Sequence, residues 1–241
     1  MPFTFSHPAA VLPLTLLPRQ WYSLTGLVIG SMVPDFEYFL RMRVRSEYSH
    51  TIGGLFWFDL PLAILLAFVF HHLVRNPLID NSPRFIISRV ESYRGFDFTT
   101  YFKRKWLVVI ASILVGAASH LLWDSFTHEH GFFVDAIPSL SSSILIGSWQ
   151  LPVYKVLQHS STVVGGFLIV LAVWMLPENK RVEEAVSISY WCMVFTITVL
   201  VVAIRLLSGL DYRLYGHVIA TGIAAFFMAL VLTPLLRFSR T

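Results

Sequence analysis

Charged residues are scarce in this sequence. Only 13% of its 241 residues are charged, whereas 56% are hydrophobic. This composition excludes an ordinary soluble domain, in which about a quarter of the residues carry charge. Several apolar runs approach the roughly 20 residues that a helix needs to cross a bilayer. The sequence therefore predicts an integral membrane protein with a single membrane domain over residues 1–241.

Cysteine and N-terminal basic residues are also nearly absent. The single cysteine, Cys192, lies in an apolar run, so one chain can form neither a disulfide nor a thiolate metal cluster. No lysine or arginine precedes Arg19, and prolines recur before it, so we expect no cleavable signal peptide. The net charge of +4 is modest, and its basic residues gather in connecting segments. That pattern favours membrane orientation over nucleic-acid binding, and we expect no nucleic-acid partner.

Long apolar segments recur along the chain. Five are long enough to span a membrane: 52–74, 106–124, 159–176, 188–207 and 214–236. Residues 7–34 form two shorter apolar arms of roughly 15–20 Å each, too short for a hydrocarbon core of roughly 30 Å. The predicted fold class is therefore all-α: an integral membrane helical bundle with about five full spans and a short N-terminal helical hairpin.

The basic residues also predict an orientation. Segment 75–105 carries seven lysines and arginines, whereas segment 125–158 carries only Lys155. Because cytoplasmic loops are enriched in these residues, we expect 75–105, the short 177–187 loop and the tail on the cytoplasmic side. Segment 125–158 then lies outside, and its apolar residues 144–151 suit the membrane interface. Three arginines in the N-terminal part argue against this orientation: Arg41, Arg43 and Arg45.

The richest polar pattern follows the second apolar run, in the stretch SHLLWDSFTHEH at residues 119–130. His120 and Asp124 are four residues apart and share one helix face. His128 continues that face if the helix persists, whereas His130 can join only if the helix breaks, which Gly131 allows. Ionisable groups at the end of an apolar helix are costly unless they pair or bind a metal. The pattern thus indicates either a hydrogen-bonded polar cap or a metal site.

Further candidate ligands occur near the ends of other segments. His7 and Asp35 lie at the open end of the N-terminal hairpin, His50 precedes the first span, and His159 begins the third. With five spans, all eight candidates lie at one membrane face. Histidine and aspartate without cysteine suit zinc first, with manganese or iron as alternatives. More than four ligands also allow a cluster of ions, which activates water in phosphoryl transfer.

Other polar residues have simpler interpretations. Asp59 is an intramembrane acid, either a partner that holds a ligand imidazole or a buried hydrogen-bonding group. We expect Glu37 to be solvated and His71 and His72 to be interfacial. His217 is interpreted as a packing histidine.

The order of the candidate ligands resembles that of a known superfamily. The series is His7, Pro34-Asp35, His50, His120-x-x-x-Asp124, His128 or His130, and His159. It is similar to the zinc-dependent phospholipase C and P1 nuclease superfamily. The Pro-Asp, Ser-His-Thr and Ser-His-x-x-x-Asp pieces resemble the bacterial membrane-bound metal-dependent hydrolases. The opening PFTFSHPA at residues 2–9 resembles an uncharacterised bacterial membrane family of unknown function. The resemblance covers residues 1–165, and residues 166–241 add further transmembrane helices.

The resemblance implies a distribution of ligands. One metal would be held by Asp35, His50, His120 and Asp124, a second by His7 with Asp124, and a third by His128 or His130 with His159. Two departures from the superfamily pattern reduce the expected number of metal ions from three to one or two. Met1 stands where the secreted enzymes have an N-terminal tryptophan ligand, and Val163 stands where they have a glutamate.

Together these patterns predict a hydrolase of the bacterial inner membrane, with its site at the extracytoplasmic face. Its substrate would be a phosphoester, either a lipid headgroup or a lipid-linked phosphate, because the site lies at headgroup depth. Asp35 would orient or deprotonate the attacking water. The alternative is a non-catalytic membrane protein with a structural metal or ion-binding site. A transporter is weaker still, because the sequence has no paired discontinuous spans.

Overall fold

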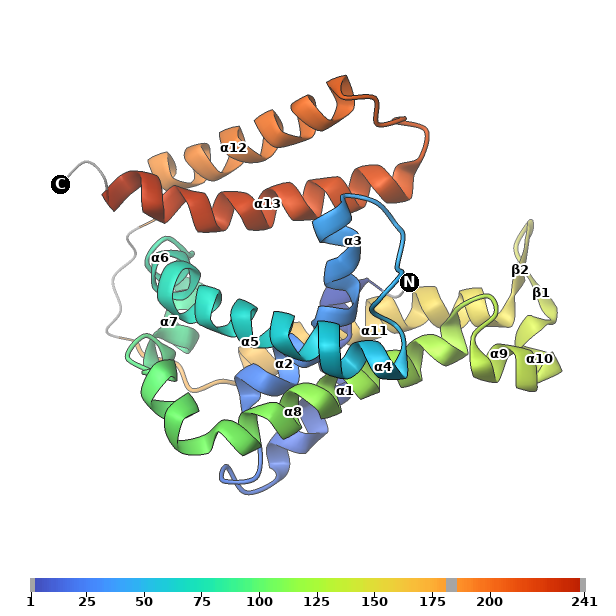
Figure 1. Cartoon of the computed structure of the whole chain (residues 1–241), viewed down its shortest axis with the longest axis horizontal. Helices are drawn as coiled ribbons and strands as arrows, with labels where there is room; N and C mark the ends of the chain where they lie inside the picture. Colours follow the sequence, from blue (N-terminus) through green and yellow to red (C-terminus); the bar gives the residue numbers. More distant parts are fainter. Residues whose placement is uncertain (1–2, 181–185, 239–241) are drawn as a thin grey trace. The chain divides into compact units, whose positions relative to one another are not determined.

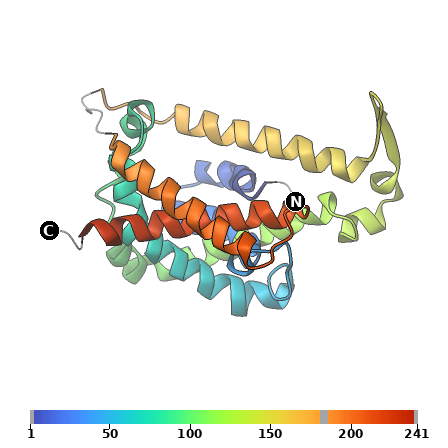
Figure 2. The same ribbon diagram turned by 90° about the horizontal axis from the view of Figure 1, so that it is seen from above.

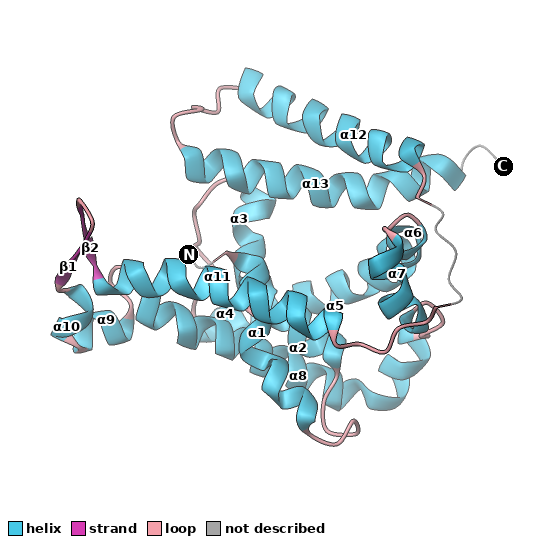
Figure 3. Ribbon diagram, turned by 180° about the vertical axis from the view of Figure 1, so that it is seen from behind, coloured by secondary structure: helices cyan, strands magenta, loops and turns pink. Residues whose placement is uncertain are grey.

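The fold was analysed in a computed structural model, which describes residues 3–180 and 186–238. Helices dominate these residues, and the one pair of short strands stands out in Figure 3. Five helical segments are long and apolar enough to cross a membrane: Ile52–Asp80, Phe98–Ala136, Val153–Trp174, Ile188–Leu207 and Tyr215–Leu236. The predicted fold class, an all-α integral membrane protein with five spans, is confirmed. Arg181 and Arg240, two of the basic residues behind the predicted orientation, lie outside the described residues.

The chain divides into two compact units that interleave along the sequence. The first comprises 3–34, 48–63 and 105–172, and the second comprises 35–47, 64–104, 173–180 and 186–238. Helices α5 (Leu60–Val69) and α8 (Phe98–Thr127) each run from one unit into the other. That the chain is one membrane domain stays a prediction.

The first unit opens with the short N-terminal helical hairpin. Its elements are η1 (Thr4–Ser6), α1 (Pro8–Val11), η2 (Leu12–Leu16) and α2 (Leu24–Met32). Pro8 occupies the first turn of α1, where its missing N–H costs nothing. Ser23 caps α2 by accepting a 3.2 Å hydrogen bond from the backbone N–H of Gly26. The first arm tightens into a 3₁₀ helix around Pro13, which cannot donate a helical hydrogen bond.

Helix α8 carries the central polar motif. It begins at Phe98, and the carboxylate of the preceding Asp97 accepts hydrogen bonds from the backbone N–H and the hydroxyl of Thr100, at 3.0 and 2.6 Å. These bonds favour the charged carboxylate and lower the pKa of Asp97. The helix kinks at Lys105, where φ is −132° and ψ is 28°. The predicted span 106–124 is thus the part of α8 that follows the kink.

Glycines bring α2 and α8 into close contact. A Cβ on Gly30 would lie 2.3 Å from the carbonyl oxygen of Ile113, and one on Gly116 would lie 2.5 Å from that of Leu27. The hydroxyl of Ser112 also accepts a 2.8 Å hydrogen bond from the N–H of Ser23. The approach of the two backbones sets the register of α2 against the half of α8 that carries the polar motif.

The segment after α8 contains structure that the sequence analysis did not predict. It forms α9 (Phe132–Ala136), α10 (Pro138–Ser141) and an antiparallel hairpin of β1 (Ser143–Ile146) and β2 (Trp149–Pro152). Gly147 begins the two-residue turn with a φ of +61°, which glycine adopts without strain. The Gly-Ser pair between two apolar runs was the available signal. Helix α11 (Val153–Trp174) follows directly.

The second unit holds the remaining helices. They are α3 (Phe36–Arg41), α6 (Arg75–Asp80), α7 (Arg84–Val90), α12 (Ile188–Leu207) and α13 (Tyr215–Phe238), with η5 (Phe70–Val74) and η6 (Glu91–Tyr93) between them. Helices α12 and α13 lie side by side (Figures 1 and 2). Their apolar side chains pack with the end of the first span in a cluster of Val74, Tyr190, Val194, Ala229 and Leu230. Between membrane spans such contacts stabilise the unit by close van der Waals packing, because lipid tails are as apolar as the side chains.

Substitution of Gly30 by alanine tests the close packing of α2 and α8. The added Cβ would overlap the Ile113 carbonyl, so Gly30→Ala should lower the free energy of unfolding by about 1–3 kcal/mol, a typical cost of overpacking. The measurement is thermal unfolding in detergent. Gly222→Ala in α13 is the matched control, because a Cβ there meets no atom within 4 Å. Unchanged stability of Gly30→Ala would contradict the described packing.

Candidate metal centre

Asp124 lies at the centre of a histidine cluster in the first unit. Its carboxylate is buried, with a side-chain exposure of 9%, and imidazole nitrogens approach both of its oxygens. Oδ2 lies 3.4 Å from His120 Nε2 and 3.6 Å from His50 Nε2. Oδ1 lies 3.5 Å from His128 Nδ1 and 3.6 Å from His7 Nε2. One buried carboxylate is therefore shared by four imidazoles.

Helix α8 supplies three members of this cluster. His120, Asp124 and His128 are spaced four residues apart, which is the spacing of neighbours on one helix face. The helical hydrogen bond from the N–H of His128 to the carbonyl of Asp124, at 3.1 Å, continues the pattern past the end of the helix at Thr127. The helix thus persists far enough for His128 to share the face, which the sequence had left open.

The contact between α2 and α8 fixes the tautomer of His120. Its Nδ1 lies 2.8 Å from the carbonyl oxygen of Ser31, and a carbonyl can only accept a hydrogen bond. Nδ1 therefore carries a proton, and in the neutral ring Nε2 presents its lone pair to the Asp124 carboxylate. A lone pair facing a carboxylate at 3.4 Å is unfavourable, so either Nε2 also carries a proton or a cation lies between the two groups. An N–H to carbonyl bond behind a ligating nitrogen is the usual support of a metal-bound histidine.

The spacing of the donor atoms fits a metal better than direct ion pairs. Charge-assisted N–H···O bonds are typically about 2.7–2.9 Å long. The separations at Asp124, from 3.4 to 3.6 Å, are longer. Four ligands arranged tetrahedrally at about 2.0–2.2 Å from zinc lie roughly 3.3–3.6 Å from one another. The separations therefore match the edges of a coordination tetrahedron.

His50 reaches the cluster from an unusual backbone conformation. Its φ is +49°, in the left-handed region that side chains other than glycine seldom adopt. The hydroxyl of Ser49 lies 2.9 Å from His50 Nδ1, and Thr51 caps the following helix α4 (Ile52–Gly54) with a 2.9 Å hydrogen bond from the N–H of Gly54. Strained backbone of this kind concentrates at functional sites, where neighbouring contacts hold it in place.

His7 enters the cluster by stacking on His120. The two ring centroids are 3.7 Å apart, with an angle of 18° between the ring planes. Two imidazolium cations in this arrangement would repel each other strongly in a buried site. At least one ring is therefore neutral, as metal ligation requires. His7 lies between η1 and α1. Two hydrogen bonds hold this part of the chain against α11, because the N–H of Phe3 and the hydroxyl of Ser6 both donate to Thr162.

Asp35 adds a second buried carboxylate. It is the last residue of η3 (Val33–Asp35), and the boundary between the units falls at its peptide bond with Pro34. Its relative exposure is 0%. One ligand atom from each of Asp35, His50, His120 and Asp124 lies within 4.8 Å of those of the other three.

Gln158 is a neighbour of the cluster that the sequence analysis missed. Its side-chain oxygen accepts a 3.0 Å hydrogen bond from Lys155, which can only donate, so its amide nitrogen faces His128 Nε2 at 3.4 Å. Gln158 is buried together with Tyr154, one turn earlier on the same face of α11. The neighbouring His159 points off this face and is exposed. The sequence carried no local signal for this choice, because the phase of α11 depends on its contacts in the fold.

Five of the eight predicted ligands lie together in the first unit. They are Asp124 and the four histidines around it: His7, His50, His120 and His128. His130 and His159 are not brought to it. Both are exposed, and no contact of either with Asp124 occurs among the described residues. His130 occupies a turn with a φ of +63° that follows the end of α8.

The polar residues that the sequence analysis set apart from the ligands lie in different parts of the fold. Asp59 is fully buried at the end of η4 (Leu55–Asp59), a π-helical turn, and π turns are frequent at functional sites. His71 and Arg75 bond to each other at 2.9 Å, and His72 bonds to Thr99 at 2.9 Å. His217 lies 3.4 Å from the N–H of Val44.

The expectation for Glu37 was wrong. Glu37 is buried, with a relative exposure of 1%, rather than solvated. Its carboxylate accepts hydrogen bonds from Arg41 at 2.8 Å, from Ser46 at 3.1 Å and from the N–H of Glu47 at 2.9 Å. These bonds compensate the loss of water and tie α3 to the segment that follows it.

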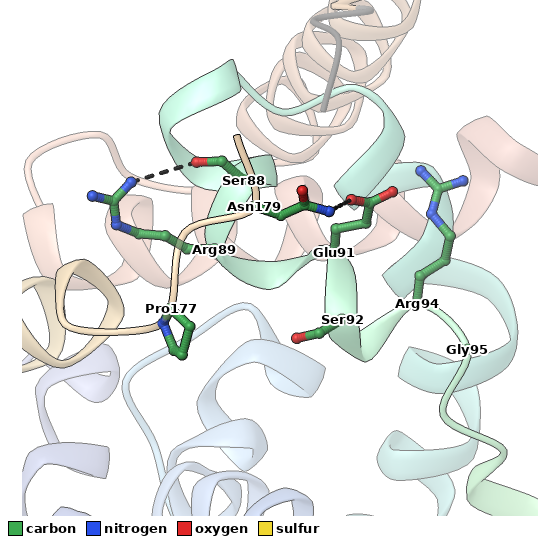
Figure 4. Close-up of a pocket in the computed structure, with 8 residues that line it drawn as sticks. All are labelled: Ser88, Arg89, Glu91, Ser92, Arg94, Gly95, Pro177 and Asn179. Carbon is green, nitrogen blue, oxygen red and sulfur yellow. Dashed lines mark hydrogen bonds between the residues drawn. The ribbon is translucent and has the colours of Figure 1, made fainter. Parts of the chain in front are cut away.

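A separate polar pocket lies in the second unit (Figure 4). It is lined by Ser88, Arg89, Glu91, Ser92, Arg94, Gly95, Pro177 and Asn179. Asn179 donates a 3.1 Å hydrogen bond to Glu91, and its N–H bonds to the carbonyl of Ser88 at 2.7 Å. The guanidinium groups of Arg89 and Arg94 lie at opposite ends of the view and do not converge. The pocket therefore lacks the joined positive charges of an anion site.

Comparisons with known proteins name a family without a function. No curated protein and no solved structure matches the chain. One family profile, described as "Domain of unknown function (DUF4184)", matches residues 1–235 and thus nearly the whole chain. The histidine cluster and the hairpin described above lie within the matched residues, and the chain belongs to the DUF4184 family of unknown function.

Proposed function

We propose that this protein is a membrane-bound, metal-dependent hydrolase that cleaves a phosphoester. The observation that carries the proposal is the approach of three imidazole Nε2 atoms, from His7, His50 and His120, to the two oxygens of Asp124 at 3.4–3.6 Å. Those separations suit ligands that share a metal rather than a proton. A cluster of imidazoles and carboxylates without thiolate favours zinc, with manganese or iron as alternatives.

The number of donors supports a site for one or two ions. Asp35, His50, His120 and Asp124 would hold the first ion, because their ligand atoms lie within 4.8 Å of one another. His7 Nε2 approaches the other oxygen of Asp124, so this carboxylate could bridge to a second ion. His128 Nδ1 lies 3.1 Å from the backbone carbonyl of Asp124, so this ring supports the cluster by hydrogen bonding. A structural zinc site needs only four ligands, whereas catalysis requires a coordination position left for water or substrate. The surplus of donors therefore favours the catalytic interpretation.

The proposed reaction is hydrolysis by activated water. A bound divalent metal lowers the pKa of water and neutralises charge on the phosphoryl oxygens. Asp35 would orient the attacking water and accept its proton. A new phosphorus–oxygen bond forms to the water oxygen while the ester phosphorus–oxygen bond breaks, and the leaving oxygen takes a proton. A carboxylate within hydrogen-bond reach of the attacking water suits this base role.

The location of the cluster supports a lipid phosphoester as substrate. His120 lies near the far end of the α8 span, roughly 20 Å from Trp106 at 1.5 Å per residue. That distance supports a position of the cluster near the headgroup layer rather than at the bilayer centre. His50 and His128 are its most open members, with side-chain exposures of 20% and 29%, so access would be from their side. The basic bias of segment 75–105 supports an extracytoplasmic site in the bacterial inner membrane.

A second candidate function is a structural metal clip. The burial of the cluster favours it, because the side chains of His7 and His120 are 1% and 0% exposed. Closed structural sites exclude water, and a metal there would tie the N-terminal helices to α8. Both the hydrolase and the structural clip predict a bound metal, whereas only the hydrolase predicts cleavage of a phosphoester.

Purified protein should contain a stoichiometric divalent metal, because the donor spacing fits ligands that share a cation. The measurement is elemental analysis after purification in mild detergent without chelators. His120→Ala should lose most of the metal, since its Nε2 faces the shared carboxylate. His72→Ala is the matched control, because His72 is exposed and bonds to Thr99. Substoichiometric metal in the wild type, or an equal loss of metal in both variants, would contradict the proposed metal site.

Segment 75–105 should face the cytoplasm and segment 125–158 the opposite side. The reason is the excess of seven basic residues against one. The measurement is labelling of intact cells with an impermeant thiol reagent, using Ser92→Cys or Ser139→Cys in a Cys192→Ser background. Both serines are exposed. Ser139→Cys should react and Ser92→Cys should react only after the membrane is opened. The reverse result would invert the orientation and place the cluster at the cytoplasmic face.

The protein should release headgroup or phosphate from phosphoester lipids in a metal-dependent manner. Asp35→Asn keeps the size of the side chain and removes its basic oxygen, so activity should fall on the order of 10²–10⁴-fold. The measurement is product release from a panel of lipids in detergent with added zinc or manganese, alongside metal content.

Two outcomes would count against the hydrolase. If metal is stoichiometric and the wild type is as inert as Asp35→Asn across the panel, the structural clip is the better account. If the wild type and Asp35→Asn are equally active, the hydrolysis arises elsewhere than at this cluster.

A further inference from the structure

We infer that the β1–β2 hairpin is a membrane-surface anchor, which lies in the interfacial layer of the bilayer with one face toward the acyl chains. The inference is independent of the metal site and of the proposed hydrolysis. It concerns the connection between α8 and α11, whose partner is the lipid itself.

The hairpin belongs to an uncharged stretch of chain. Residues 136–154 contain no aspartate, glutamate, lysine, arginine or histidine, although Asp135 and Lys155 flank them directly. Loops in water usually carry charge, because polar side chains keep an exposed backbone solvated. The absence of charge removes the main cost of moving this stretch out of bulk water.

The strand register divides the hairpin into two different faces. Residues directly opposite each other in an antiparallel pair point to the same side, and successive residues alternate. The pairs Ile144↔Leu151 and Ile146↔Trp149 therefore share one face. The other face carries Ser143↔Pro152 and Leu145↔Gln150. One face is wholly apolar, and the other is mixed.

The apolar face is not covered by the protein. Ile144, Ile146 and Trp149 are 40%, 47% and 71% exposed. None of them belongs to a hydrophobic core cluster of the residues that the structure describes. A two-stranded ribbon alone is only marginally stable in water, so an exposed apolar face needs an apolar surrounding.

The direction of the hairpin suits the membrane surface. The ribbon runs across the axis of α11 rather than continuing it, as two perpendicular views show (Figures 1 and 2). It is joined to the start of α11 without a linker, because the N–H of Val153 bonds to the carbonyl of Ser142 at 3.0 Å. Since α11 is a membrane span, a ribbon across its end lies along the bilayer surface. Trp149 has the side chain most enriched at that depth.

Lipid is favoured over a second copy of the chain. The hairpin is tethered to the ends of two spans, so the bilayer surface is beside it in every molecule. Burial against another chain would require a matching apolar patch, whereas acyl chains fit any apolar surface. Interfacial aromatic and aliphatic side chains also need no fixed partner geometry.

Depth measurement with a fluorescent label tests the inference. Single cysteines replace Ile146 on the apolar face or Gln150 on the mixed face, in a Cys192→Ser background, and carry an environment-sensitive fluorophore. The protein is reconstituted in phosphatidylcholine vesicles that contain lipids brominated near the glycerol. Lipid bromine should quench the label at position 146 several-fold more than the label at 150, and aqueous iodide should show the opposite order. Ser139→Cys in α10 provides a water-exposed reference.

Two results would overturn the anchor. Equal iodide access at positions 146, 150 and 139 would mean that the hairpin stands in water. Protection of position 146 from both quenchers, with efficient disulfide crosslinking between copies, would mean that a second chain covers the face. Both readouts leave metal content and hydrolysis untouched, so failure here is separate from failure of the proposed function.

Discussion

The buried carboxylate of Asp124 is the constraint on which the first unit depends. A negative charge with a side-chain exposure of 9% at the end of a membrane span is costly without compensation. Four histidines surround it, and each comes from a segment whose local structure serves to deliver it. The glycine contact of α2 with α8 fixes the tautomer of His120, and the left-handed residue His50 turns its ring inward. A cation shared by the carboxylate and the imidazoles would account for all of these features.

The membrane explains why the site is built from helix ends. Within the hydrocarbon every backbone group must be bonded internally and every polar side chain needs a partner in the protein, so polar sites are less costly near the ends of spans. The cluster occupies the end of α8, and the hairpin follows beyond α9 and α10. A polar site at the end of a span suits a substrate that approaches from the headgroup layer, as the proposed function requires.

Much of this architecture was readable from the sequence, and the reasons for the exceptions are physical. Hydropathy predicted five spans because length and composition alone define them. The i, i+4 spacing put His120, Asp124 and His128 on one face because helix geometry is local. Whether Gln158 or His159 faced the cluster depended on the phase of α11, which tertiary contacts set. Glu37 appeared solvated because its partners Arg41, Ser46 and Glu47 meet it only in the fold.

The central claim is that imidazoles and carboxylates at Asp124 share a metal. X-ray absorption spectroscopy of the purified protein at the edge of its bound metal tests this most directly. The account predicts a first shell of nitrogen and oxygen at about 2.0–2.2 Å with the outer-shell scattering of several imidazole rings. His120→Ala should weaken that imidazole signal. A spectrum without imidazole scattering, or one with sulfur ligands, would contradict the account.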